Sequence, residues 1–283
     1  MTAYEDRLSQ DSRWALNEGG LYFDEKSEVH KSLRKIADSL RTLGIEYSIV
    51  GGMALFRHGF RRFTEDVDVL VTEEGLKELH RQLDGRGYLP PFERSKNLRD
   101  TDNGVKIEFL VSGKYPGDGK PKPVAFPHPA DVCEEHDGIQ YVKLPTLVEM
   151  KLASGMTNSE RMKDLSDVQE LIKIMNLPID FGDALNPYVR DKYVELWNAS
   201  QPRQKRYVLI WRSPKPAPDA TMPEDLHASS QRGDSTLQAM LLDGVQVDSR
   251  KEIAEDGVYL VTTDPDVARK YGMHDEDEFM DSE

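Results

Sequence analysis

Cysteine is almost missing from this 283-residue sequence, which contains Cys133 alone. A single cysteine can form neither an intrachain disulfide nor a cysteine-based metal site. Long apolar runs are missing as well, because no stretch approaches the roughly 18–20 residues that a membrane span needs. The first residues, MTAYEDRLSQDSRW, also lack the basic and apolar parts of a signal peptide. We therefore expect a cytoplasmic protein that does not bind membranes.

Basic residues are the second shortage, since 37 Lys and Arg stand against 51 Asp and Glu, for a net charge of −14. The deficit is concentrated after residue 212, where 6 basic residues face 17 acidic ones. The remaining 31 basic and 34 acidic residues leave the first 212 positions nearly balanced. This distribution argues against a broad face for duplex DNA. It allows a local site for a triphosphate or an RNA end, since net charge does not describe local sites.

The segment 47–59, YSIVGGMALFRHG, is the first half of the most informative stretch. Residues 47–50 predict a short buried strand that ends at Gly51 and Gly52. Two glycines permit a tight turn and let a ligand approach the backbone closely. A short helix is expected to follow from Met53 to His58, and its free N–H groups would favour an anion.

The second half of this stretch is Asp66–Val71, DVDVLV, which predicts another strand. Strand side chains alternate between faces, so Asp66 and Asp68 share one face while Val67 and Val69 enter the core. Two neighbouring carboxylates repel each other unless a cation lies between them. A hard divalent ion such as Mg²⁺, which prefers oxygen ligands, is the natural occupant.

The order hydrophobic-Gly-Gly, thirteen residues, then Asp-x-Asp resembles the signature of the nucleotidyltransferase superfamily related to DNA polymerase β. That resemblance implies an α/β (α+β) fold in which helices flank a small mixed sheet. It implies transfer of a nucleoside monophosphate (NMP) from a nucleoside triphosphate (NTP) to a hydroxyl group, with two Mg²⁺ ions. Asp66 and Asp68 would hold the ions, and Gly51, Gly52 and Met53 would face the phosphates.

The resemblance also calls for a third carboxylate on a neighbouring strand. Val105–Val111 is the next predicted strand, and Glu108 lies on the face opposite its apolar residues. Glu108 is the candidate for the third ligand, although the family more often has Asp there. The alternative is a polar-face glutamate that pairs with Lys106 or with a neighbouring strand. The loop 112–129 that follows is rich in Gly, Pro and Lys, and we expect it to be a flap near the substrate.

Two further helices are predicted, one from Leu144 with a capping box from Thr146 to Glu149 and a break near Gly155, and one over 159–175. Together they resemble the helical region of the branch that includes AbiEii-type toxins. By that resemblance Lys151 binds the NTP phosphates, and Asp164 or Asp167 on the second helix orders Lys151 or contacts the nucleotide. The candidates on that helix are Arg161, Lys163, Asp164 and Asp167. Separately, Arg62 and Thr64 are expected to line the rim of the pocket.

An ordinary explanation exists for part of this helix, because Lys163 and Asp167 are spaced as a surface ion pair. The domain organisation is expected to be as follows: an N-terminal arm over 1–24, a nucleotidyltransferase core over 25–143, a helical region completing the NTP site over 144–200, a strand and proline-rich linker over 201–223, and a small acidic unit with a mobile tail over 224–283.

Several functions fit these residues. The acceptor of an NMP-transferring enzyme would be RNA such as a tRNA end, a protein or a small molecule. The AbiEii-type resemblance implies a toxin–antitoxin or defence role and hence a cognate antitoxin. The alternatives are an antibiotic-type small-molecule transferase and a non-catalytic regulatory or binding protein on the same fold.

Overall fold

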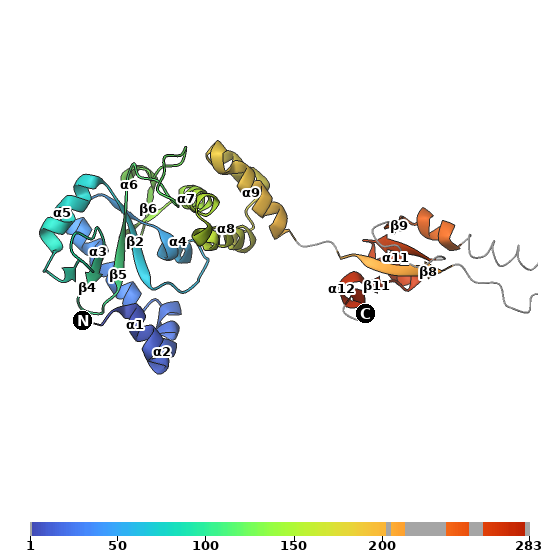
Figure 1. Ribbon diagram of the computed structural model, residues 1–283, viewed down its shortest axis with the longest axis horizontal. Helices are drawn as coiled ribbons and strands as arrows, with labels where there is room; N and C mark the ends of the chain where they lie inside the picture. Colours follow the sequence, from blue (N-terminus) through green and yellow to red (C-terminus); the bar gives the residue numbers. More distant parts are fainter. Residues whose placement is uncertain (1, 202–204, 213–235, 249–256, 281–283) are drawn as a thin grey trace, which may run out of the picture. The chain divides into compact units, whose positions relative to one another are not determined.

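The chain divides into two compact units, residues 1–201 and 202–283, in a computed structural model (Figure 1). The model describes residues 2–201, 205–212, 236–248 and 257–280. The predicted proline-rich linker over 213–223 lies outside the described residues.

A seven-stranded mixed sheet forms the centre of the first unit. Its strand order is β3-β4-β5-β2-β1-β7-β6. Strand β2 pairs antiparallel with β1 and parallel with β5, and β1 pairs parallel with β7. The strands are β1 (Tyr47–Ile49), β2 (Asp66–Val71), β3 (Tyr88–Leu89), β4 (Leu98–Asp100), β5 (Lys106–Val111), β6 (Cys133–His136) and β7 (Ile139–Val142).

Helices flank this sheet, and Figure 1 shows α3 and α5 on one side of strands β2 and β5 and α4, α7 and α8 on the other. The helices of the first unit are α1 (Tyr4–Gln10), α2 (Ser12–Phe23), α3 (Glu28–Thr42), α4 (Gly51–Arg57), α5 (Glu73–Leu83), α6 (Pro129–Val132), α7 (Leu144–Thr157), α8 (Met162–Met175) and α9 (Pro187–Ser200), with 3₁₀ turns at Ser159–Arg161 and Ile179–Ala184. The expected fold class, a mixed sheet flanked by helices and followed by a helical region and a small α/β unit, is confirmed.

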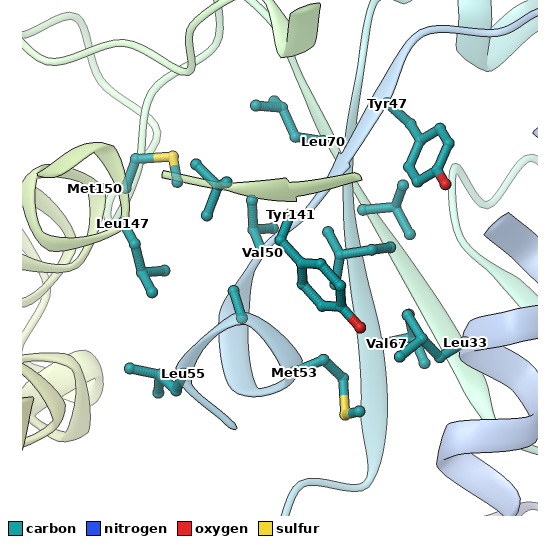
Figure 2. Packing of buried hydrophobic residues seen from close by; sticks show 14 of the residues in the cluster. Leu33, Tyr47, Val50, Met53, Leu55, Val67, Leu70, Tyr141, Leu147 and Met150 are labelled. Atoms are coloured by element: carbon teal, nitrogen blue, oxygen red, sulfur yellow. The ribbon is translucent and has the colours of Figure 1, made fainter. Parts of the chain in front are cut away.

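The core of the first unit joins the sheet to helices on both sides. Figure 2 shows Leu33 of α3, Met53 and Leu55 of α4 and Leu147 and Met150 of α7 around the sheet. Each of these side chains is no more than 6% exposed. At about 25 cal/mol per Å² of apolar surface removed from water, such a continuous cluster fixes the helices firmly on the sheet. The residues beside the carboxylates are therefore held by a packed core.

Residues 4–23, expected as a polar arm, form the helices α1 and α2. Although most of their residues are polar, the two helices bury Tyr4, which is 1% exposed, and Tyr22, which is 0% exposed. The Tyr4 hydroxyl donates to Glu18 at 3.0 Å, and the backbone N–H of Tyr4 donates to the Gly104 carbonyl at 3.2 Å. Each helix packs only two apolar side chains against the core, Tyr4 and Leu8 from α1 and Trp14 and Tyr22 from α2, so the sequence shows little periodicity.

Helix α7 begins where predicted, but its cap and its end differ from the prediction. It begins at Leu144, with Pro145 in the first turn, so the capping box at Thr146 is wrong. Glu149 instead accepts a hydrogen bond from the Asn186 backbone N–H at 2.6 Å. Gly155 does not break the helix, which continues to Thr157. A Cβ on Gly155 would lie 2.6 Å from Leu165 Cγ, so this glycine permits close packing of α7 on α8.

The second unit contains a four-stranded antiparallel sheet with the order β11-β8-β10-β9. Met240, Val245 and Leu260 are among the buried residues of its own small core. Residues 274–280, expected as part of an acidic tail, form β11 and α12. Among the described residues of the whole chain, no helix combines the length and apolarity that crossing a bilayer requires. Besides helical residues over 236–242, the described elements of this unit are β8 (Tyr207–Arg212), β9 (Gln246–Val247), β10 (Gly257–Thr262), α11 (Pro265–Tyr271), β11 (His274–Asp275) and α12 (Glu276–Met280).

Candidate active site

Two parallel strands bring three carboxylates together. Asp66 and Asp68 lie on β2, and the pairing of β2 with β5 puts Glu108 directly opposite Asp68. One carboxylate oxygen from each residue lies within 4.8 Å of the other two. Val67 and Val69 are fully buried, as the alternation predicted. Three acidic groups so close together repel one another, and a divalent cation would relieve that repulsion.

The two glycines are required because the site is crowded around them. Gly51 adopts a φ of +59°, and a Cβ built on it would lie 2.6 Å from Asp68 Cγ. A Cβ on Gly52 would lie 2.7 Å from the Cβ of Thr64. Helix α4 begins at Gly51, two residues earlier than expected, so the glycines form its first turn. A larger side chain at either position would displace a neighbour of the carboxylate cluster.

The segment between α4 and β2 supplies two of the predicted rim residues. The Thr64 hydroxyl donates to Asp66 Oδ1 at 2.7 Å, which fixes one carboxylate oxygen of the cluster. Arg62 donates from Nε and Nη2 to the two oxygens of Asp167, at 2.7 and 2.9 Å. This bidentate geometry is the strong form of an arginine–carboxylate pair. It ties the segment that leads into β2 to helix α8.

Glu108 has two neighbours of opposite kind. It faces Asp68 in the cluster, and it also contacts the ammonium group of Lys106. The two explanations offered by the sequence, a metal ligand and a partner of Lys106, therefore both describe its surroundings. Because the Lys106 side chain is about one third exposed, its ammonium can move to solvent when a cation takes its place.

Lys151 is the centre of a buried ionic network. Its Nζ lies 2.8 Å from Asp164 Oδ1 and 2.7 Å from Asp167 Oδ2. Asp167 is 2% exposed and also pairs with Arg62, so its interpretation as a surface partner of Lys163 is wrong. Ser154, one helical turn after Lys151, donates to Asp164 Oδ2 at 2.7 Å. The network joins α7, α8 and the segment before β2.

The carboxyl groups of the cluster and of the network have pKa values shifted in opposite directions. Burial, reinforced by Asp66 and Glu108, raises the pKa of Asp68 to about 8. Burial alone would also raise the pKa of Asp164, but Lys151 and Ser154 hold it below its ordinary value. Negative neighbours therefore dominate the surroundings of Asp68, whereas the positive charge of Lys151 compensates that of Asp164. Strongly perturbed pKa values of this kind cluster at functional sites.

A cavity of about 440 Å³ opens onto these groups. Of the residues singled out in the sequence, all except Met53 and Asp167 line it, and Arg161 and Lys163 lie on its wall. The Met53 side chain is instead 2% exposed and accepts from the Tyr22 hydroxyl at 3.6 Å, so it belongs to the core. The predicted residues in the lining are Gly51, Gly52, Arg62, Thr64, Asp66, Asp68, Glu108, Lys151, Arg161, Lys163 and Asp164.

The loop 112–128 contributes Tyr115, Pro116 and Gly117 to the wall of the cavity. Lys122, whose side chain is 5% exposed, bonds to Asp118 at 2.6 Å and to the Thr157 hydroxyl of α7 at 3.1 Å. The loop is thus fastened to α7. Ser154 and the wall residues Tyr115 and Lys96 were not singled out in the sequence, although the spacing of three between Lys151 and Ser154 places both on one helix face.

A scan against models of protein families finds no match, and neither does a search of curated proteins. Solved structures do show likeness to this chain. A candidate nucleotidyltransferase from Thermotoga maritima is 20% identical over 48% of this chain and 89% of its own, with a TM-score of 0.36. The protein JHP933 from Helicobacter pylori is 17% identical over 76% and 95%, with a TM-score of 0.35.

A third structure, ANT(2'')-Ia in complex with adenylyl-2''-tobramycin, is 11% identical over 73% of this chain and 97% of its own. Its TM-score is 0.29. Since all three scores lie below 0.5, these likenesses assign neither a substrate nor an activity to this chain.

Proposed function

We propose that the protein is a Mg²⁺-dependent nucleotidyltransferase that moves NMP from an NTP to a hydroxyl acceptor. The observation that carries this proposal is the convergence of Asp66, Asp68 and Glu108 within 4.8 Å, beside two glycines that let Asp68 and Thr64 approach the turn closely. A structural role explains this cluster poorly, because three neighbouring carboxylates destabilise a fold unless a cation joins them.

The donor atoms of the cluster fit Mg²⁺. Asp66, Asp68 and Glu108 offer only carboxylate oxygens, the hard ligands that this ion prefers, and would hold two ions between them. When bound, the ions stabilise charge on the phosphoryl oxygens and lower the pKa of the attacking hydroxyl. Thr64 orients Asp66 by its hydrogen bond, and Gly51 allows Asp68 to approach the turn.

The triphosphate belongs on the side of the cavity formed by α4, α7 and α8. Backbone N–H groups of Gly51 and Gly52 open helix α4 there, and unpaired backbone donors at a helix start favour anions. Lys151 is held between Asp164 and Asp167, so its ammonium is fixed in position before substrate arrives. Arg161 and Lys163 add positive charge on the same wall.

For the acceptor we favour an RNA end, such as that of a tRNA, or a protein in a toxin–antitoxin or defence setting with a cognate antitoxin. The support is the resemblance of residues 144–172 to AbiEii-type toxins. A small molecule of the antibiotic type is the alternative acceptor. Incubation with each radiolabelled NTP beside total RNA, a protein lysate and the protein itself identifies donor and acceptor by the labelled species.

Isothermal titration with Mg·NTP tests the proposal directly. We expect binding by the wild-type protein and at least tenfold weaker binding by the double variant Asp66→Asn, Asp68→Asn. Glu74→Gln, which neutralises an exposed carboxylate outside the cavity, is the control and should bind like wild type. Equal affinity in all three proteins would remove both the site and the proposed activity.

A further inference from the structure

The segment 90–97 between β3 and β4 reaches the edge of the cavity at Lys96. Its centre is a tight turn in which the Ser95 N–H donates to the Phe92 carbonyl at 3.0 Å. Arg94 takes the left-handed conformation within this turn, with a φ of 63°. Ser95 is 6% exposed, whereas the Phe92 ring is 69% exposed. The turn therefore presents an aromatic face to solvent immediately before a residue that lines the site.

The base of this segment is anchored to the strand that carries Glu108. The backbone N–H of Phe109, the residue after Glu108, donates to Asn97 Oδ1 at 3.0 Å. Asn97 in turn donates from its N–H to Ser95 Oγ at 3.0 Å. From the other side, His80 Nε2 of α5 lies 3.1 Å from the Lys96 carbonyl. These contacts fix the turn relative to the carboxylate cluster, so a ligand on it would lose little binding energy to ordering of the protein.

The charge of the segment is positive where it meets the cavity. Lys96 and Arg94 are both exposed, and Lys106 lies at the Glu108 end of the cluster. Glu93 lies 3.8 Å from Arg94, but both side chains are more than 90% exposed, so solvent screens this pair. A lone exposed phenylalanine is ordinary. It is unusual, however, to find an exposed ring with two cationic side chains on a fixed segment beside a proposed phosphoryl-transfer site.

On the premise of the NMP transfer described above, we propose that segment 90–97 binds the acceptor, and that the acceptor is the end of a single-stranded nucleic acid. A base stacks on Phe92, and backbone phosphates contact Arg94 and Lys96. Such a pairing of aromatic faces with a basic track is how proteins hold single strands without reading their sequence. A cationic small molecule would be repelled by Arg94 and Lys96.

The proposed reaction transfers NMP to the terminal hydroxyl of the bound strand. The terminal hydroxyl oxygen of the strand forms a bond to the α-phosphorus of the NTP, the bond from that phosphorus to the bridging oxygen breaks, and pyrophosphate leaves. The hydroxyl proton passes to solvent. Because the segment is anchored next to Glu108, it approaches the cluster from the side of β5, away from the triphosphate side formed by α7 and α8.

Fluorescence anisotropy with a labelled single-stranded RNA oligonucleotide and the full-length protein, in the absence of NTP, tests this inference. We expect Phe92→Ala to weaken binding roughly tenfold and Phe92→Trp to retain it, because stacking needs only an aromatic face. Phe23→Ala, which removes another exposed phenylalanine on α2, is the matched control and should bind like wild type. The double variant Arg94→Gln, Lys96→Gln should make the slope of log K against log salt concentration shallower by about 1.4, because two phosphate contacts are lost.

Three results would contradict the inference. Binding of Phe92→Ala that equals wild type, equal binding of a duplex, or labelling of protein and not of nucleic acid would overturn the inference. A single-stranded DNA of the same sequence shows which sugar the site accepts. The Phe92→Ala variant is also titrated with Mg·NTP and should bind it like wild type, because Phe92 does not line the cavity. Failure of the proposed function has its own signature, unchanged Mg·NTP affinity in the Asp66→Asn, Asp68→Asn variant, which the oligonucleotide titration does not measure.

Discussion

At the scale of single residues, space and backbone conformation decide the geometry of the site. The sequence indicated that Gly51 and Gly52 admit a ligand, but it could not show which side chains press against them. Those neighbours, Asp68 and Thr64, come from the next strand and from the segment before it. The glycines thus set the position of the carboxylates as well as the access to them.

Replacement of Gly51 by alanine tests this role. We expect Gly51→Ala to lose at least tenfold in Mg·NTP affinity and to be destabilised by about 1–3 kcal/mol, because the new Cβ meets Asp68 and the residue keeps a positive φ. The matched control is Gly44→Ala, with a φ of +66° but open space around its Cβ. It should share the strain and keep the affinity. Titration calorimetry and urea unfolding measure the two effects, and equal affinity loss in both variants would contradict the crowding argument.

His30 is a buried residue that the sequence did not mark. It is 4% exposed, and its Nδ1 lies 2.9 Å from Ser27 Oγ. Its Nε2 is the one buried side-chain polar atom in the described part of the chain that has no hydrogen-bond partner. Burial first, and then the nearby Arg34, lowers the pKa of His30 to about 4. The folded protein therefore keeps this imidazole neutral.

The pH dependence of stability follows from that shift. The unfolded chain takes up the proton near pH 6.5 and the folded chain only near pH 4, so the stabilising difference is complete above 6.5 and is lost as the pH falls through this window. We expect His30→Phe to lose less stability than wild type between pH 7.5 and 4.5, by roughly 2–3 kcal/mol. Urea unfolding at both pH values measures it. The exposed-residue variant His128→Gln should follow wild type, and parallel curves for His30→Phe would refute the argument.

At the scale of elements, alternation and glycine placement predicted the strands that carry the carboxylates. Strand β2 begins and ends as expected, because its faces differ so clearly in polarity. The start of α7 at Leu144 was predicted, whereas the role of Gly155 could not be read from local sequence, since its packing partner Leu165 lies on α8. The Lys151 network was suggested only by resemblance. Its Arg62 member lies 105 residues before Asp167.

Breaking this network distinguishes a buried from an exposed ion pair. We expect Asp167→Asn to destabilise the protein by about 3–5 kcal/mol, because Lys151 and Arg62 would keep their charges in a buried site with one carboxylate fewer. Glu170→Gln on the same helix removes a surface pair with Lys173 and should cost no more than about 1 kcal/mol. Urea unfolding followed by circular dichroism compares them. A cost below about 1 kcal/mol for Asp167→Asn would mean that this buried network contributes no more to stability than a surface pair.

At the scale of the whole molecule, each of the two units has its own sheet and its own apolar core. The sequence indicated a composition change near residue 212, and the structure divides the chain at residue 201. The candidate site lies entirely in the first unit. The residues that line the cavity with the carboxylates all lie between Val50 and Asp164.

This distribution predicts that a protein ending at Gln201 folds and binds Mg·NTP with the affinity of the full chain, within about twofold. The apolar cluster of the first unit reaches from Tyr4 to Tyr193, so the truncation removes none of its buried members. Calorimetric titration of both proteins measures the affinity, and a thermal melt of the shorter one should show a single cooperative transition. A tenfold loss of affinity would mean that residues 202–283 contribute to the donor site. A clear gain would mean that their 17 acidic residues beyond position 212 compete with the triphosphate for the cations around the cavity.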